Sequence, residues 1–315
     1  MAPPIAKPAN VSARPRRRQG SSPLFRTALA LALAATFLLA TPVVLSALRS
    51  VKPPVGRESQ LVFGQVVIPG LAPGACMGFA PNGARTGKTV FIDPGHGGLD
   101  PGVVVSAGGQ QVLEKTVALS VGARMGELLR ADGYRVVLSR TADSSVLKLA
   151  ADDSVTGALT ASAVHRDLVA RVDCANAASA SVLVSIHFDA FDDPAVGGAE
   201  TFYDAARPFA GSNRQLATDL QSALVAELGM DDRGVWTDDG VGTALTTSGT
   251  LYDHLVVLGP AAAGWVDQPS AMPGALVEPL FLTNPAEAGL AADPSGQRRI
   301  ASALRTGVEK YLSGS

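Results

Sequence analysis

Thr89-Val-Phe-Ile-Asp-Pro-Gly-His-Gly-Gly98 joins a strand pattern to a tight turn and an isolated histidine. Its first four residues are β-branched or aromatic, which is typical of a buried strand. Asp93-Pro94-Gly95 is a turn signal, because Pro fixes φ and Gly accepts unusual backbone conformations. His96 follows between glycines, so its imidazole can be approached closely. Because α/β proteins place their chemistry at the carboxyl ends of strands, His96 is a candidate site residue, although a loop histidine without a role fits equally well.

A second strand of similar design ends at His187. The run Ser181-Val-Leu-Val-Ser-Ile186 is almost continuously apolar, which predicts a strand buried on both faces. Two histidines at the ends of such strands can meet at one edge of a parallel sheet. Zinc binds imidazole and carboxylate ligands, and a catalytic zinc site keeps one position open for water. We therefore look for a carboxylate as the third ligand.

Two glutamates are candidates for acidic roles. Glu114 opens a helical pattern with apolar residues at three- and four-residue steps. It is either a metal ligand or a helix-start acid favoured by the macrodipole, and the pattern leaves both open. Glu278 ends the apolar strand pattern at Ala275-Leu-Val277. An acid there is costly unless it is paired or lies in a cleft, where it can act as a general base and then a general acid.

The segments FIDPGHGG, LEKTVAL, SIH and LVEPLFLTN, in this order, resemble the zinc-dependent N-acetylmuramoyl-L-alanine amidases of bacteria. The resemblance runs from about Lys88 to the C-terminus. It implies one zinc ion per chain, with His96, Glu114 and His187 as ligands and Glu278 as the catalytic acid and base. It also implies hydrolysis of the amide bond between N-acetylmuramic acid and L-alanine in peptidoglycan or its muropeptide fragments.

The chain departs from the family pattern near two of these residues. Leu280 replaces a glycine two residues after Glu278, and Phe188 and Asp189 replace an alanine and an asparagine after His187. These changes are expected to reshape the rim of the pocket and its substrate preference. An exported zinc peptidase that cuts within the stem peptide is an alternative reading. An inactive wall-binding domain is another, although the three expected zinc ligands and the expected catalytic glutamate are all retained.

Other polar residues receive supporting roles. Asp93 is predicted to orient His96 from outside the ligand set. Arg140 and Arg171 are expected to form salt bridges rather than to act in catalysis. His165 and His254 are expected to be surface or capping residues.

Strand and helix patterns alternate along the chain. Strands are predicted at Tyr134–Leu138, Ala199–Tyr203 and Leu255–Leu258, and helices at Asn213–Leu228 and Gln297–Leu312. This alternation predicts a single α/β domain, with a mostly parallel twisted sheet and helices on both faces. With 315 residues and 47% hydrophobic side chains, the chain can bury one substantial core. Residues 238–272 are expected to be irregular and to form a wall of the cleft.

The N-terminal segment has a different composition. We divide the chain into a basic cytoplasmic tail (1–26), a signal peptide or transmembrane anchor (27–48), a linker and N-terminal extension (49–86) and a zinc amidase catalytic domain (87–315). The uncharged run from Thr27 to Leu48 is long enough to span a bilayer or to form the core of a signal peptide. Because basic residues precede it, the remainder should lie outside, in the periplasm or cell wall, and anchored to the outer face of the membrane if the segment stays uncleaved.

Charge and cysteine content agree with export. The first 50 residues hold seven Lys and Arg and no acid, which leaves 19 basic and 28 acidic residues and a net charge of −9 for the rest. Such an acidic domain is a poor partner for nucleic acid, and we expect a monomer. Cys76 and Cys174 are the only cysteines, and both lie in the exported part. Oxidising surroundings favour a disulfide between them over two buried free thiols.

Overall fold

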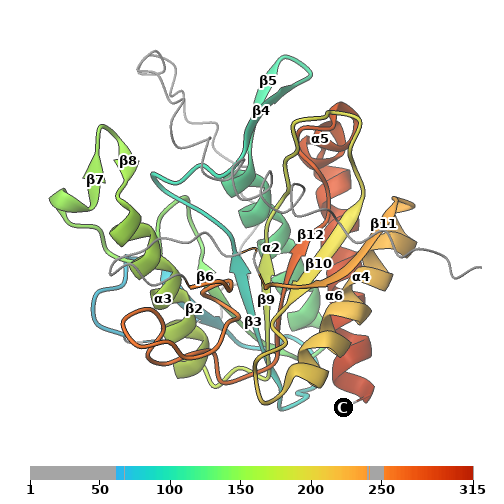
Figure 1. Ribbon diagram of the computed structural model, residues 1–315. Helices are drawn as coiled ribbons and strands as arrows, with labels where there is room; N and C mark the ends of the chain where they lie inside the picture. Colours follow the sequence, from blue (N-terminus) through green and yellow to red (C-terminus); the bar gives the residue numbers. More distant parts are fainter. Residues whose placement is uncertain (1–61, 67, 240, 242–251, 315) are drawn as a thin grey trace, which may run out of the picture.

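An eight-stranded sheet, in the order β1-β2-β6-β3-β9-β12-β10-β11, forms the centre of the molecule (Figure 1). The computed structural model describes residues 62–66, 68–239, 241 and 252–314. The strands of this sheet are β1 (Val62–Gln65), β2 (Ala75–Phe79), β3 (Thr89–Pro94), β6 (Arg135–Arg140), β9 (Val182–Ile186), β10 (Ala199–Tyr203), β11 (Asp232–Thr237) and β12 (Gly274–Glu278). Two small antiparallel pairs lie outside it, namely β4 (Val104–Ala107) with β5 (Gln110–Leu113) and β7 (Ser154–Val155) with β8 (Ala158–Leu159).

The four central strands β6, β3, β9 and β12 are parallel to one another. The direction reverses on both sides, because β2 is antiparallel to β6 and β10 is antiparallel to β12. At the far side β11 again runs parallel to β10. The predicted α/β domain is thus confirmed, with reversed strands flanking the parallel centre.

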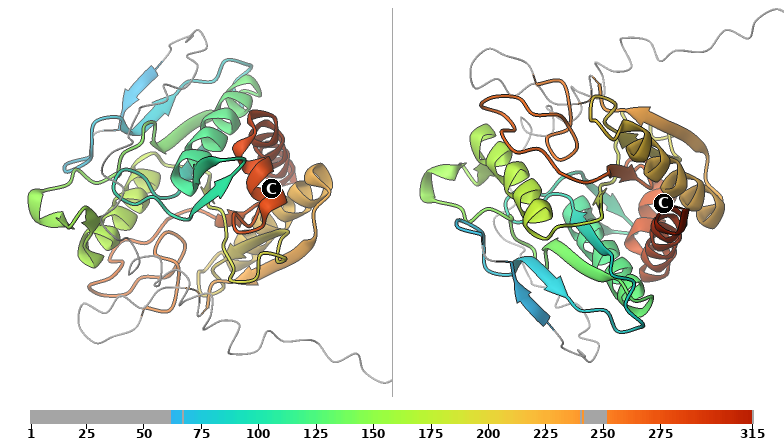
Figure 2. Two further views of the ribbon diagram at one scale, coloured as in Figure 1. Left: turned by 90° about the horizontal axis from the view of Figure 1, so that it is seen from above. Right: turned by 90° about the horizontal axis from the view of Figure 1, so that it is seen from below.

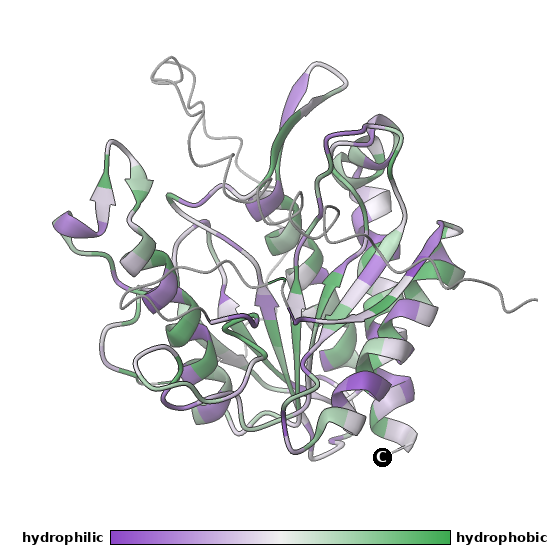
Figure 3. Cartoon of the chain, in the orientation of Figure 1, coloured by the Kyte–Doolittle hydropathy of each residue, from purple (hydrophilic) through white to green (hydrophobic). Residues whose placement is uncertain are grey.

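Helices cover both faces of the sheet, as Figure 2 shows. The helices are α2 (Glu114–Ala131), α3 (Ala161–Ala177), α4 (Ala210–Leu228), α5 (Pro285–Ala292) and α6 (Pro294–Gly314), with a short 3-10 turn at Ala151–Asp153. On one face α2, α4 and α6 share a core with β3, β9 and β12. On the other face α3 packs together with turns between residues 252 and 272. The apolar central strands stand out between these layers in Figure 3.

The predicted disulfide is confirmed. Cys76 of β2 and Cys174 of α3 are bonded, with their Cα atoms 5.7 Å apart and a sequence separation of 98. Both side chains are completely buried. The bridge therefore fixes α3 against an outer strand of the sheet.

The strand predicted at Leu255–Leu258 is wrong. This segment forms a tight turn, in which the backbone N–H of Leu258 bonds the carbonyl oxygen of Leu255 at 2.9 Å. Val257 and Leu258 bury their side chains against the sheet face, so their apolar character reflects packing rather than strand pairing. The irregular character expected for residues 238–272 holds in the part of it that the structure describes.

The predicted tail and membrane segment, residues 1–48, lie outside the described residues. Within the described part, none of the helices combines the length and the apolar character needed to cross a bilayer. Two strands from the predicted N-terminal extension, β1 and β2, are part of the main sheet through the pairing of β2 with β6.

Candidate active site

The carboxyl ends of β3 and β9 bring His96 and His187 together. The two strands are parallel neighbours in register, with Pro94 opposite Ile186. His187 follows β9 directly, and His96 follows β3 after one glycine. Glu114 is the first residue of α2, which packs across this edge. Three of the four predicted site residues thus come from separate segments that the fold gathers at one edge.

The donor atoms of these three side chains converge. Nε2 of His96 lies 2.9 Å from Oε1 of Glu114, and Nδ1 of His187 lies 3.2 Å from the same oxygen. The two imidazole nitrogens are 3.1 Å apart. Each residue therefore presents one possible ligand atom to a common point, and a single cation there can satisfy all three. Two imidazoles with one carboxylate form a donor set that zinc accepts.

Two glycines make this convergence possible. A Cβ added at Gly95 would lie 2.4 Å from the His187 ring, and one at Gly102 would lie 2.5 Å from a carboxylate oxygen of Glu114. Real Cβ atoms do not approach other atoms so closely, so any other residue would displace a donor. The glycines around His96 noted in the sequence serve this close approach.

Glu114 is fixed by backbone groups. Its Oε1 accepts a hydrogen bond from the Phe188 N–H at 2.9 Å, and its Oε2 accepts one from the Val103 N–H at 2.9 Å. The side chain is buried. Burial alone would raise the pKa of Glu114, but His96 and His187 outweigh this effect and lower it. A buried carboxylate held in this way is a preformed ligand rather than a solvated helix-start acid.

Asp100 takes the place beside His96 that was expected for Asp93. Nδ1 of His96 is 2.8 Å from a carboxylate oxygen of Asp100. Asp93 lies beneath the loop, where its carboxylate accepts hydrogen bonds from Arg171 at 2.7 Å and Ser185 at 2.9 Å. The correction follows from the backbone, because Asp93 is still within β3 and its side chain points into the sheet layer rather than along the loop.

Two buried arginines support the loop from below. Arg171 binds Asp93 and Asp167 and also donates to the carbonyl oxygen of His96 at 2.7 Å. Arg140 donates to the carbonyl oxygens of Pro94 and Gly95, at 3.0 and 2.8 Å. Arg171 thus forms the predicted salt bridges, whereas Arg140 donates to backbone carbonyl oxygens. Both arginines position the backbone on either side of the histidine.

The site attracts positive charge. Burial lowers the pKa of His96, but the Glu114 and Asp100 carboxylates more than compensate and raise it to about 10. The metal-free cluster therefore favours a proton on His96. A divalent cation would supply the same compensation.

Glu278 ends β12 next to His187. The strands β9 and β12 are parallel, with Ile186 opposite Val277, and the His187 N–H donates to the Val277 carbonyl oxygen at 3.0 Å. Oε2 of Glu278 is shielded from solvent and has no hydrogen-bond partner among the described residues. Burial, followed by the nearby Asp189 carboxylate, raises the pKa of Glu278 well above its usual value. A carboxyl group in this state can both accept and release a proton near neutral pH.

Sequence reasoning missed the acidic surroundings of Glu278. Glu200 of β10 lies opposite Glu278 in the antiparallel register. Burial, followed by the neighbouring Glu200 carboxyl group, raises the pKa of Asp189 well above its usual value. Arg233 binds the other side of Glu200 at 3.0 Å. The signal in the sequence was Asp189 itself, an acid where the family pattern has an amide.

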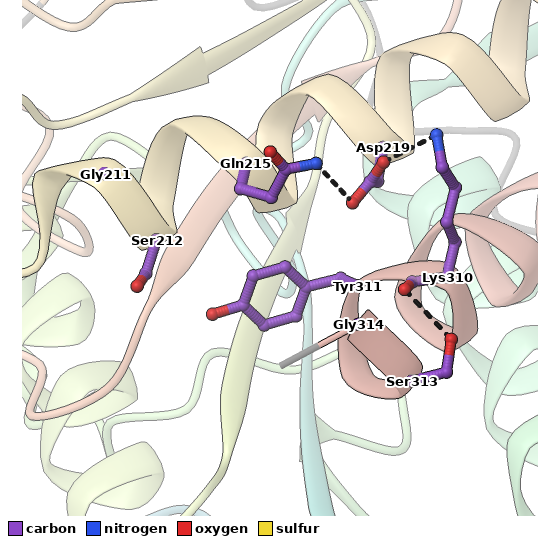
Figure 4. A pocket seen from close by; sticks show the side chains of 8 residues that line it. All are labelled: Gly211, Ser212, Gln215, Asp219, Lys310, Tyr311, Ser313 and Gly314. Atoms are coloured by element: carbon purple, nitrogen blue, oxygen red, sulfur yellow. Dashed lines mark hydrogen bonds and ion pairs between the residues drawn. The ribbon is translucent and has the colours of Figure 1, made fainter.

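A pocket of about 580 Å³ lies elsewhere, between α4 and α6 (Figure 4). Its acidic group, Asp219, is already paired with Lys310 at 2.7 Å and with Gln215 at 3.0 Å. None of the four candidate site residues lines it. This pocket therefore offers no chemistry that competes with the cluster at the ends of β3, β9 and β12.

Comparisons with known proteins agree with this site. The family model for N-acetylmuramoyl-L-alanine amidase matches residues 90–310. N-acetylmuramoyl-L-alanine amidase LytC of Bacillus subtilis is 33% identical over 225 residues, which cover 71% of this chain and 36% of LytC. The germination-specific N-acetylmuramoyl-L-alanine amidase of the same organism is 29% identical over 228 residues, which cover 72% of this chain and 81% of that protein. The chain thus spans only about a third of LytC but most of the second relative.

A solved structure shares the architecture. The CwlD amidase from Clostridioides difficile, in complex with the GerS lipoprotein, has a TM-score of 0.56 and 27% sequence identity, covering 72% of this chain and 100% of that chain. The matched range includes all four of His96, Glu114, His187 and Glu278. Because the family model matches more than half of this chain, the chain belongs to the N-acetylmuramoyl-L-alanine amidase family.

Proposed function

We propose that this chain hydrolyses the amide bond between N-acetylmuramic acid and L-alanine in peptidoglycan, with one zinc ion held by His96, Glu114 and His187. One observation carries the proposal. The donor atoms of these residues lie within 3.2 Å of one another, and Glu278, whose buried Oε2 has no hydrogen-bond partner among the described residues, ends the strand next to His187. This combination of a three-ligand site and a separate carboxyl group matches the needs of a metallohydrolase.

Bound zinc would lower the pKa of a water toward about 7 and polarise the scissile carbonyl. The protein's own contribution is to fix the three ligands. Asp100 holds the His96 ring through Nδ1, and backbone N–H groups hold both oxygens of Glu114. Such outer contacts maintain the ligands in one orientation and reduce the entropy lost when the ion binds.

Glu278 is assigned the proton transfers. Its carboxylate would take a proton from the attacking water at Oε2 while the new carbon–oxygen bond forms. It would then deliver this proton to the nitrogen of L-alanine as the carbon–nitrogen bond breaks, which leaves a free amine and a carboxylate. The raised pKa of Glu278 favours this second step, because burial stabilises the protonated form that donates the proton.

The proposal extends to the location of the protein. We assign residues 1–26 to a cytoplasmic tail, 27–48 to a signal peptide or anchor and 87–315 to a catalytic domain outside the membrane. The Cys76–Cys174 disulfide supports an oxidising compartment, where such bonds persist. The acidic charge of this part disfavours nucleic acid, and we expect it to act as a monomer on the cell wall.

Mass spectrometry of digested peptidoglycan tests the reaction. The full chain, purified in mild detergent, is incubated with intact sacculi after removal of metal by a chelator, with and without added zinc. We expect soluble stem peptides that begin with a free L-alanine amine, and glycan strands that keep the lactyl carboxylate. Both products should require zinc.

Other products would contradict the proposal. Shortened stem peptides still attached to the glycan would indicate a zinc peptidase acting within the stem. Binding to sacculi with no released product at any zinc concentration would indicate an inactive wall-binding domain.

A further inference from the structure

A second cluster of possible metal ligands lies at the carboxyl ends of β10 and β11, at the opposite ends of the strands from the candidate active site. Asp204 follows β10 and Asp238 follows β11, and these strands are parallel neighbours in which Tyr203 lies opposite Thr237. Because β10 is antiparallel to β12, its carboxyl end lies away from Glu278. The two aspartates therefore meet at an edge far along the strands from the candidate active site.

His254 completes this cluster. Its Nδ1 lies 2.9 Å from Oδ2 of Asp204 and 3.4 Å from Oδ1 of Asp238. The exposed carboxylate of Asp239 is 3.7 Å away. The Tyr252 ring packs edge-on against His254, with centroids 5.6 Å apart, which restricts the imidazole. The expectation that His254 is a surface or capping residue is wrong, because its ring nitrogen faces two buried aspartates.

Both aspartates are fully buried, at 0% exposure. Each uses one oxygen for a backbone hydrogen bond, Asp204 from Ala206 at 2.8 Å and Asp238 from Leu255 at 3.0 Å. Oδ2 of Asp204, however, is shielded from solvent and makes no hydrogen bond with a described residue, although it faces His254. A buried carboxylate oxygen without a hydrogen bond is costly, so a positive charge beside this atom would be favourable.

The nearby Arg207 acts on Asp204 through its charge, but the two form no ion pair. Arg207 directs its guanidinium to the backbone carbonyl oxygens of Gly259 and Ser270. Among the described residues, the ion-pair partner that both buried carboxylates face is the His254 imidazole. A divalent ion would neutralise both carboxylates and accept the neutral imidazole as a ligand at once.

We propose that Asp204, Asp238 and His254 bind a second divalent metal ion of the zinc class. The imidazole favours such an ion over calcium or magnesium, which prefer oxygen ligands alone. The ion would join the ends of β10 and β11 to the turn that carries His254. Its position at the opposite edge from Glu278 makes it a structural ion, which stabilises the fold rather than taking part in hydrolysis.

Zinc content measures this site directly. The full chain is stripped with a chelator, dialysed against buffer containing limiting free zinc, and analysed by plasma mass spectrometry. We expect about two zinc ions per wild-type chain and about one in the double variant Asp204→Asn/Asp238→Asn. Asp253→Asn, a change at an exposed residue beside His254, is the matched control and should retain both ions.

His187→Ala separates this inference from the proposed function. If both proposals hold, it also binds about one ion, and its combination with the double variant binds none. If the zinc assignment at His187 fails, the difference between wild type and Asp204→Asn/Asp238→Asn remains. His254→Gln provides a second test should the double variant fold poorly, as judged by circular dichroism.

Two results would overturn the second site. One is an equal zinc content in the wild type, the double variant and His254→Gln. The other is retention of calcium in place of zinc when both are supplied. The first would mean that the cluster is an ion pair of protonated His254 with the aspartates.

Discussion

His96 and His187 follow parallel strands at one edge of the sheet, and Asp204 and Asp238 follow another parallel pair at the opposite edge. In both places the register sets two strand-end residues side by side, and a third residue from elsewhere in the chain completes the group. The same rule of parallel pairing therefore builds both clusters. They differ in how buried charge is compensated.

At the first edge, the positive charge of Arg171 compensates the buried carboxylate of Asp93. Burial alone would raise the pKa of Asp93, but the Arg171 guanidinium outweighs it and lowers the pKa. At the second edge, burial and the Asp204 carboxylate raise the pKa of Asp238 to about 7. The comparison suggests that the first edge is a rigid support for chemistry, whereas the second is an incomplete charge cluster that needs an ion.

The largest expected effect separates metal binding from catalysis at the first edge. Glu278→Ala should lose at least about a hundredfold in amide hydrolysis, because general acid–base help is removed. It should keep its zinc, since Glu278 is outside the ligand set. His96→Ala, Glu114→Ala and His187→Ala should lose zinc affinity and activity together.

Metal content and muropeptide cleavage, measured on the same samples, check this contrast. Zinc loss in Glu278→Ala with zinc retained in Glu114→Ala would mean that the roles of the two glutamates are reversed.

The Arg171–Asp93 pair gives the next largest effect. Asp93→Asn leaves a buried guanidinium with one carboxylate partner fewer, which should cost about 3 kcal/mol in the free energy of unfolding. Because the folded pKa of Asp93 lies below its unfolded value of 3.8, this stabilisation is complete above that pH and is lost as the pH falls below it. Urea denaturation should therefore show a gap between wild type and variant that closes under acid conditions.

Glu227→Gln is the control for that experiment. Its partner Arg299 is 3.5 Å away, and both side chains are 43% exposed. Pairs of this kind contribute little to stability, so the variant should unfold almost as the wild type does at every pH. A similar loss in both variants would show that Arg171 and Asp93 do not form a special support for the first edge.

The disulfide should stabilise the folded protein without favouring either cluster. Replacing Cys76 and Cys174 with serine removes a bridge that closes a loop of 98 positions, at a cost of about 2–4 kcal/mol. The bridge acts mainly on the unfolded chain, so zinc content under native conditions should not change at either edge. Urea denaturation and metal analysis check both parts, and selective zinc loss would show that the bridge directly shapes one cluster.

Much of the first cluster could be predicted because its signals are local. His187 follows an apolar run, and His96 follows a strand and a Pro-Gly turn, while Glu114 begins a periodic helix. Asp100 was not predicted, since an aspartate in a glycine-rich loop is an ordinary turn residue. Only the path of the loop shows that it reaches back to the His96 ring.

The second cluster could not be predicted for a related reason. β11 reads Asp-Arg-Gly-Val-Trp-Thr, without the apolar run or clear alternation that marks a strand. Without that strand there is no register to place Asp238 beside Asp204. His254 lies 50 positions after Asp204 in an irregular segment, so no spacing motif connects them.

Asp204→Asn should give the smallest effect and the opposite sign to Asp93→Asn. In the metal-free protein it removes a buried charge whose Oδ2 faces the His254 ring at 2.9 Å but makes no hydrogen bond with a described residue, and the amide can keep the contact with the Ala206 N–H through its oxygen. The free energy of unfolding should therefore stay constant or rise by about 1 kcal/mol, as when unmatched buried charges are replaced. With zinc present the order should reverse, because the wild type gains binding energy that the variant cannot. Urea denaturation with chelator and with zinc measures both differences. If Asp204→Asn is as damaging as Asp93→Asn in chelator, His254 already compensates the aspartates, and the two edges balance their charge in the same way.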